Sequence, residues 1–290
     1  INASLDRLEL MTANTSPPFN DVDLNKATSL QIKRYQDILK DYCSDEDVGS
    51  YSIFPDIDQQ KQCAQLQASE IQDHIASGQE NKNAYYYLAR AYSVMGDTEE
   101  EINALQKAIA LDPAFYDAYM ELGIAFRAQG RFEEAISQFF EALRLKPESA
   151  EAYNNIGNVL AIQGKADEAV VYYSRALQYN PDFVETHNNI ANVLKGQGKT
   201  EEAIKHYLRV LQVEPDHVQT IQNLGRVFAE QGKLEDALNQ FIEALKIEPE
   251  NADLHNYAGL VLGQQGQLSE AVNHFMEAIR INPDHFLAHK

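Results

Sequence analysis

The sequence has few of the residues that mark disulfide-rich, metal-binding or membrane-spanning proteins. It has no tryptophan, and only two cysteines, Cys43 and Cys63, in 290 residues. Two cysteines exclude a disulfide framework and a zinc signature. They leave two alternatives open: one disulfide bridge if the protein is exported, or two reduced thiols if it is cytoplasmic. We expect a cytoplasmic protein. No apolar run approaches the roughly 18 residues of a membrane-spanning helix, so no membrane insertion is expected.

Basic residues are scarce as well. There are 24 lysines and arginines against 44 aspartates and glutamates, for a net charge of −20. Residues 1–81 have 14 acids and 6 bases (net −8), and the remainder has 30 acids and 18 bases (net −12). Proteins that bind DNA or RNA present a basic surface, so no nucleic-acid partner is expected. The chain begins with Ile1 rather than Met, which we interpret as a processed or cut fragment.

The sequence is rich in internal repetition, with a period of 34 residues. The segment YNNIGNVLAIQGKADEA at 153–169 recurs as HNNIANVLKGQGKTEEA at 187–203. Prolines and glycines keep the same period, at Pro113, Pro147, Pro181, Pro215, Pro249 and Pro283 and at Gly96, Gly130, Gly164, Gly198, Gly232 and Gly266. A fixed period of 20–50 residues indicates a repeat architecture and decides the fold.

Each period predicts two helices, with a glycine turn between them and a proline turn after them. Glycine just beyond a helix takes the left-handed conformation that ends it, and proline stops the second helix. Apolar residues follow helical spacing in both halves, as at Tyr119, Leu122, Phe126, Ala135, Phe139 and Ala142. Small residues recur where the two helices must cross closely, at Ala89, Gly123, Gly157, Ala191, Gly225 and Gly259.

The segment YMELGIAFRAQGRFEEAISQFFEALRLKP at 119–147 resembles the tetratricopeptide (TPR) repeat. Six repeats can be placed, at 82–115, 116–149, 150–183, 184–217, 218–251 and 252–285. The resemblance implies an all-α fold, a right-handed α-solenoid of six helical hairpins. It also implies that the first helices line a concave groove and that the second helices form the convex back.

The residues outside the six repeats are expected to form the two ends of the solenoid. Residues 1–81 are expected to hold an irregular segment, a helix at 28–43 and a helix at 59–77 that caps the first repeat. Residues 286–290 begin a truncated seventh repeat. Because no polar capping helix follows the sixth repeat, we expect its apolar side to be exposed and to form a homo-oligomer end to end.

The asparagines of the repeated NNxxN motif need an explanation other than core packing. On a first helix they lie three residues apart, and therefore on one face. They are Asn155, Asn158, Asn189, Asn192 and Asn223, and Arg226 continues the row. An amide has donors and an acceptor, so it can bond a peptide backbone. One interpretation is a polar ladder that binds an extended peptide or a partner helix, and the other is a structural link between adjacent repeats.

The NNIGN and NNIAN segments are similar to repeats of O-linked N-acetylglucosamine transferases, whose asparagine ladder holds the substrate backbone. The resemblance places Asn155, Asn189 and Asn223 in that ladder, which Tyr87, Glu121 and Tyr257 interrupt. It implies an alternative function, the substrate-recognition arm of a larger protein glycosyltransferase.

A second TPR binding mode clamps a C-terminal carboxylate with basic residues. Asn158 and Asn189 match the asparagines of that clamp, but its basic positions are Asn154, Gln219 and Asn223 here. Uncharged groups bind a carboxylate less strongly, which disfavours the clamp. Lys195 and Arg226 on the groove side would still favour an acidic ligand.

No catalytic, metal or cofactor site is predicted. Gly198-Lys199-Thr200 resembles the end of a phosphate-binding loop, but Val193 stands where that loop requires glycine. His285 and His289 have helical spacing without a third ligand. His206 and His274 lie on second helices and are expected to be solvated. The sequence therefore predicts a protein-interaction module and not an enzyme.

Overall fold

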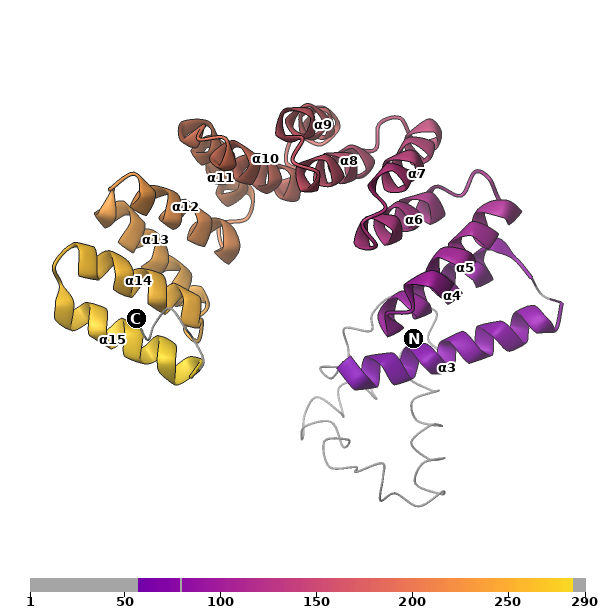
Figure 1. The fold of residues 1–290 in the computed structure, drawn as a ribbon, viewed down its shortest axis with the longest axis horizontal. Helices are drawn as coiled ribbons and strands as arrows, with labels where there is room; N and C mark the ends of the chain where they lie inside the picture. The colour runs from indigo at the N-terminus through magenta and orange to yellow at the C-terminus, as the bar shows by residue number, and fades with distance from the viewer. Residues whose placement is uncertain (1–56, 79, 284–290) are drawn as a thin grey trace, which may run out of the picture. The chain divides into compact units, whose positions relative to one another are not determined.

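The computed structural model describes residues 57–78 and 80–283 (Figure 1). The predicted helix at 28–43, the residues that begin a seventh repeat, and Cys43 lie outside these residues. The chain divides into two compact units at Asp112 and Pro113. Every regular element in the described part of each unit is a helix.

The described part of the first unit contains three helices, α3 (Ile57–Ala76), α4 (Lys82–Met95) and α5 (Thr98–Leu111). Helix α3 packs against α4, and α4 packs against α5. Helix α4 begins where the Asn81 side chain accepts a hydrogen bond of 2.9 Å from the Ala84 amide. It ends at Gly96, whose φ of 85° is left-handed. The helix predicted at 59–77 is therefore α3, and it covers α4.

The second unit contains five helical hairpins, which Figure 1 shows following one another in chain order. Their first helices are α6 (Tyr116–Ala128), α8 (Ala150–Ile162), α10 (Val184–Gly196), α12 (Val218–Glu230) and α14 (Ala252–Gln264). Their second helices are α7 (Phe132–Leu145), α9 (Ala166–Tyr179), α11 (Thr200–Val213), α13 (Leu234–Ile247) and α15 (Leu268–Ile281). Corresponding helices begin 34 residues apart, as the sequence period predicts.

Glycine turns close each hairpin of this unit. Gly164, with a φ of 77°, follows α8, and the amide of Lys165 then donates to the Leu160 carbonyl at 2.9 Å. This pattern uses the free carbonyls at the helix end, and a β-carbon is unfavourable at such a φ.

The core of each hairpin depends on a close crossing between a small residue and an aromatic ring. A β-carbon added at Gly157 of α8 would lie 2.5 Å from Cε1 of Tyr173 in α9. Gly123, Gly225 and Gly259 meet Phe139, Phe241 and Phe275 in the same way. Tyr173 is 2% exposed and the ring of Tyr207 is fully buried. Packing therefore requires glycine at these four positions within the first helices, whereas the positive φ requires it at the turns.

Adjacent hairpins are joined by a repeated polar contact and by contacts between their first helices. Gln163, Gln197 and Gln231, each just after a first helix, donate to Glu133, Asp167 and Glu201 of the preceding second helix at 2.8–3.1 Å. First helices of successive repeats also contact each other, α6 with α8, α8 with α10 and α12 with α14. This closer approach places the first helices on the inner side of the second unit.

Candidate functional site

A polar network joins the first helices α8 and α10. Asn154 of α8 is 2% exposed, and its Oδ1 atom accepts from the Thr186 hydroxyl at 3.0 Å and from Asn189 Nδ2 at 3.2 Å. Its Nδ2 atom donates to Glu185 at 2.9 Å. All three partners lie on α10, so one buried amide holds the beginning of the next repeat in place.

Asn158 lies one turn further along α8 and accepts two hydrogen bonds at one oxygen. The Tyr173 hydroxyl donates to Asn158 Oδ1 from α9, and Asn189 Nδ2 donates to it from α10, both at 2.8 Å. Asn158 Nδ2 makes a longer contact of 3.4 Å to Glu185. The second helix of one repeat and the first helix of the next therefore meet at this carbonyl.

The next repeat has the same arrangement with weaker geometry. The Tyr207 hydroxyl donates to Asn192 Oδ1 at 2.6 Å, and Asn223 Nδ2 lies 3.5 Å from that oxygen. Burial raises the pKa of Tyr207 to about 12, and burial also raises the pKa of Tyr173. Both hydroxyls therefore keep their protons at neutral pH and act as donors.

The three predicted ladder residues differ in how far the protein itself engages them. Asn189 uses its amide nitrogen on the preceding repeat, and Asn223 is buried, with Gln219 donating to it at 3.4 Å. Asn155 is half-buried on α8, and within the described residues its side chain makes no hydrogen bond. The structure therefore brings Asn158 into contact with Asn189, and Asn192 into contact with Asn223. It leaves the amide of Asn155 without a hydrogen bond to any described residue.

The two basic residues of the predicted site also have partners. Lys195 forms an ion pair of 2.9 Å with Glu230, and the Arg226 guanidinium lies 5.5 Å from the centre of the Tyr257 ring. Both side chains are half-buried. Their charges are therefore partly compensated before any ligand binds.

Sequence reasoning missed Asn154 as a structural residue and misplaced two histidines. The prediction that His206 and His274 are solvated is wrong, because each is half-buried and hydrogen-bonded to a second histidine. The signal was present in the sequence, since His187 and His255 stand at one shared repeat position and His206 and His274 at another. Only the crossing of the helices shows that these positions touch.

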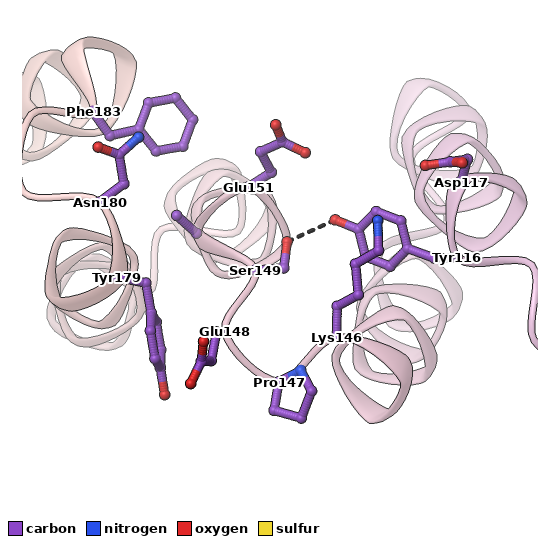
Figure 2. Close-up of a pocket in the computed structure, with 11 residues that line it drawn as sticks. Tyr116, Asp117, Lys146, Pro147, Glu148, Ser149, Glu151, Tyr179, Asn180 and Phe183 are labelled. Carbon is purple, nitrogen blue, oxygen red and sulfur yellow. Dashed lines mark hydrogen bonds between the residues drawn. The ribbon is translucent and has the colours of Figure 1, made fainter.

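A surface cleft of about 890 Å³ lies beside the turn between the repeats 116–149 and 150–183 (Figure 2). The hydroxyls of Tyr116 and Ser149 hydrogen-bond there at 2.6 Å, and the Lys146 ammonium lies 3.7 Å from the centre of the Tyr116 ring. The carboxylates of Asp117, Glu148 and Glu151 point in different directions in Figure 2. A cleft of about 610 Å³ occupies the same place two repeats later, around Pro215. Because the three carboxylates of the first cleft diverge, we assign no chemistry to it.

Among the residues that the structure describes, no group of three or more His, Cys, Asp or Glu side chains is arranged to hold a metal ion. None of the helices between Ile57 and Ile281 combines the length and the apolar character needed to cross a bilayer.

Stacked helical hairpins with polar side chains on their inner helices define a repeat protein of the interaction type. Sequence profiles described as tetratricopeptide repeat match residues 150–183, 184–217, 252–285 and 83–115, and a TPR repeat profile matches 123–161 and 225–266. These matches span more than half of the chain. The chain belongs to the tetratricopeptide repeat family, and it is in general terms a protein-interaction scaffold.

Solved structures share this fold at low sequence identity. YrrB is 24% identical with a TM-score of 0.53, over 64% of this chain and 96% of YrrB. PilF of Pseudomonas aeruginosa is 20% identical with a TM-score of 0.62, over 72% of this chain and 95% of that one. A chain of the Cut9–Hcn1 complex is 20% identical with a TM-score of 0.62, and the match covers 79% of this chain and 45% of that one. None of the curated protein sequences matches the chain significantly.

Proposed function

We propose that the chain binds an extended peptide, or an extended segment of a partner protein, along the first helices of the second unit. The observation that carries the proposal is the Asn155 amide, which is half-buried on α8 and makes no hydrogen bond within the described residues. An amide that is partly withdrawn from water gains most when a ligand supplies its missing partners. A peptide backbone offers a donor and an acceptor at each residue.

Asn189 extends this surface to the next repeat. Its nitrogen bonds Asn158, but its carbonyl oxygen has no hydrogen bond within the described residues. Asn223 would add a third contact on α12, and Lys195 and Arg226 would favour an acidic ligand. One structural relative, YrrB, is described as a TPR protein with an unusual peptide-binding site, and this supports the proposal at the level of fold.

The test compares two triple variants of the 290-residue chain. Peptides are first selected from a random peptide library on the unaltered protein, and their affinity is measured by calorimetry. We expect Asn155→Ala, Asn189→Ala and Asn223→Ala together to weaken binding roughly tenfold to a thousandfold, since each hydrogen bond contributes about 0.5–1.5 kcal/mol. The matched control changes Gln178, Gln212 and Lys246 to alanine, which are exposed on second helices of the same repeats.

The two interpretations of the asparagines predict different results. A ligand-binding ladder predicts weaker binding in the triple variant. In Asn155→Ala alone it predicts weaker binding with little change in melting temperature, because Asn189 and Asn223 also contact the protein itself and Asn155 makes no hydrogen bond within the described residues. A purely structural role predicts unchanged affinity and a lower melting temperature. Unchanged affinity in the triple variant would overturn the proposal.

The alternative, a substrate-recognition arm of a protein glycosyltransferase, would use the same asparagines. Weaker peptide binding in the triple variant is therefore common to both. A catalytic glycosyltransferase domain encoded in the same protein as this chain would support the alternative, and its absence from the complete gene would exclude it.

A second proposal, self-association, is favoured by the exposed side of α15. Leu268, Val272 and Met276 are exposed there, whereas the equivalent Leu234, Leu238 and Ile242 of α13 are half-buried. Burying these side chains between two copies would remove apolar surface from water.

Light scattering should therefore show reversible dimers at high concentration. We expect Val272→Lys to abolish them, and Val171→Lys, at an exposed position of α9, to leave them intact. A strict monomer at every concentration would contradict this expectation.

A further inference from the structure

Two histidine pairs occupy the same place in two repeats. His187 Nδ1 of α10 lies 2.9 Å from His206 Nδ1 of α11, and His255 Nδ1 of α14 lies 3.0 Å from His274 Nδ1 of α15. The equivalent residues in the other three repeats of the unit are Tyr119 and Gln138, Tyr153 and Tyr172, and Ile221 and Gln240. Within these repeats, histidine stands at the first position only where it also stands at the second.

The contacts determine which nitrogens carry protons in the neutral pairs. His187 Nε2 lies 2.9 Å from the Pro181 carbonyl, and His255 Nε2 lies 3.1 Å from the Pro249 carbonyl. A carbonyl only accepts, so these Nε2 atoms are protonated and the Nδ1 atoms of the same rings accept. His206 and His274 then donate from Nδ1. Each pair thus joins the two helices of its repeat and the proline turn before them.

The rings meet end to end, which limits how many protons a pair can hold. The ring centroids are 5.1 Å and 5.2 Å apart, so the two Nδ1 atoms face each other directly. One added proton can bind Nε2 of His206, which makes no hydrogen bond within the described residues, and the Nδ1 contact survives. A second must bind Nδ1 of His187, and two N–H groups on two cationic rings would then point at each other.

The surroundings of His206 do not compensate for a second positive charge. Burial is the main cause that lowers the pKa of His206, and the charge of His187 lowers it further. Glu202, one turn earlier on α11, opposes this shift but does not reverse it. In the turn before α10, the carboxylate of Asp182 is already paired with Arg209.

The second pair has an equivalent environment. Burial and then His255 lower the pKa of His274, and Glu270 and Glu277 of the same helix oppose the shift without reversing it. Glu277 is held by Arg280 at 2.6 Å, and Arg280 also reaches Glu250 of the preceding turn at 3.0 Å. Both pairs are therefore more stable in the less protonated state.

We propose that the two histidine pairs are acid-sensitive latches, which hold the first and second helices of repeats 184–217 and 252–285 together and open when both imidazoles are protonated. A histidine in the opened chain has an ordinary pKa of about 6.5. Stability from the latch is therefore fully present above this pH, and is lost as the pH falls through the lowered pKa of His206 or His274 in the closed latch. Each proton bound only on opening shifts the closed-to-open ratio about tenfold per pH unit.

Opening of the His187–His206 latch should perturb the polar network between α8 and α10. His187 directly follows Thr186, whose hydroxyl bonds the buried Asn154. Both residues lie in the first turn of α10, so motion of one displaces the other. We therefore expect the contact between repeats 150–183 and 184–217 to loosen at acidic pH.

The test is the pH dependence of urea unfolding in the full chain and in one quadruple variant. The substitutions His187→Tyr, His206→Gln, His255→Tyr and His274→Gln copy the pair Tyr119 and Gln138 of the repeat at 116–149. Between about pH 7.5 and about pH 5, we expect the unfolding midpoint of the unaltered protein to fall more steeply than that of the variant. Every carboxylate is retained, so general acid destabilisation is common to both. His74→Gln, at an exposed position of α3, serves as the control and should behave as the unaltered protein does.

The side-chain NMR titration of the unaltered protein gives an independent readout if the variant does not fold. The latch predicts two separated steps for the imidazoles of each pair, with the lower step accompanied by loss of the α10–α11 and α14–α15 contacts. Equal pH dependence in the variant and the unaltered protein would overturn the proposal. Titration of all four imidazoles in a single step, together with His74, would overturn it as well.

Discussion

Replacement of Gly157 by leucine is expected to lower the free energy of unfolding by about 1–3 kcal/mol, because it overpacks a close helix crossing. The first carbon of the new side chain would lie 2.5 Å from Cε1 of Tyr173, and the rest would enter the same ring. That ring cannot move freely, since it is buried and its hydroxyl donates to Asn158. The equivalent position in the next repeat is Ala191, so one methyl group can be accommodated there but an isobutyl group has no space.

Gly196→Leu is the matched control for this prediction. Gly196 lies at the end of α10, and a β-carbon built there meets nothing within 4 Å. Leucine has a higher helix propensity than glycine, so this variant should be neutral or slightly stabilising. Urea unfolding followed by circular dichroism measures both. Equal midpoints for Gly157→Leu and the unaltered protein would show that the crossing is not tightly packed.

Asn154→Ala is expected to cost about 3 kcal/mol of stability, because three hydrogen bonds of about 1 kcal/mol each are lost at once. The buried hydroxyl of Thr186 loses its acceptor, Asn189 loses one of its two, and the Glu185 carboxylate loses its closest donor. The unfolding transition should broaden as well, because α8 and α10 belong to neighbouring repeats and would uncouple.

Asn155→Ala, one residue further along the same helix, is the control for Asn154→Ala. Its side chain makes no hydrogen bond within the described residues, so we expect a change within about 0.5 kcal/mol. The same variant should weaken peptide binding. The two variants together therefore distinguish Asn154, which stabilises the repeat, from Asn155, which binds the ligand. A large loss of stability in Asn155→Ala would contradict this division.

The repeat pattern made the fold predictable to the level of individual helices. The glycine at 164 and the proline at 181 limit α9 from either side, and the observed helix runs from Ala166 to Tyr179. The small residue at Gly157 was recognised as a crossing point from its periodic recurrence, and the structure identifies Tyr173 as the ring that requires it. Periodicity is a strong signal because the same turn and packing residues recur at the same position of each repeat.

The candidate site was only partly predictable. The spacing of Asn155 and Asn158 placed both on one helix face, but spacing within a helix does not tell which groups of the next helix approach that face. In the structure Asn158 accepts from Tyr173 and Asn189, while Asn155 has no such partner among the described residues. The structural role of Asn154 was not predictable, because its three partners lie more than 30 residues away along the chain.

By itself, the sequence determined the helices, their turns and the small residues at their crossings, because local backbone preferences and apolar spacing act within about one repeat. Only the tertiary structure decided which asparagines are engaged by the protein, and that the histidines of α10 and α11 meet at their Nδ1 atoms. The physical reason is that hydrogen-bond partners are assigned by distances of about 3 Å between atoms on different helices. Such distances depend on the angle and offset at which the helices cross, and the period along the chain indicates only where they cross.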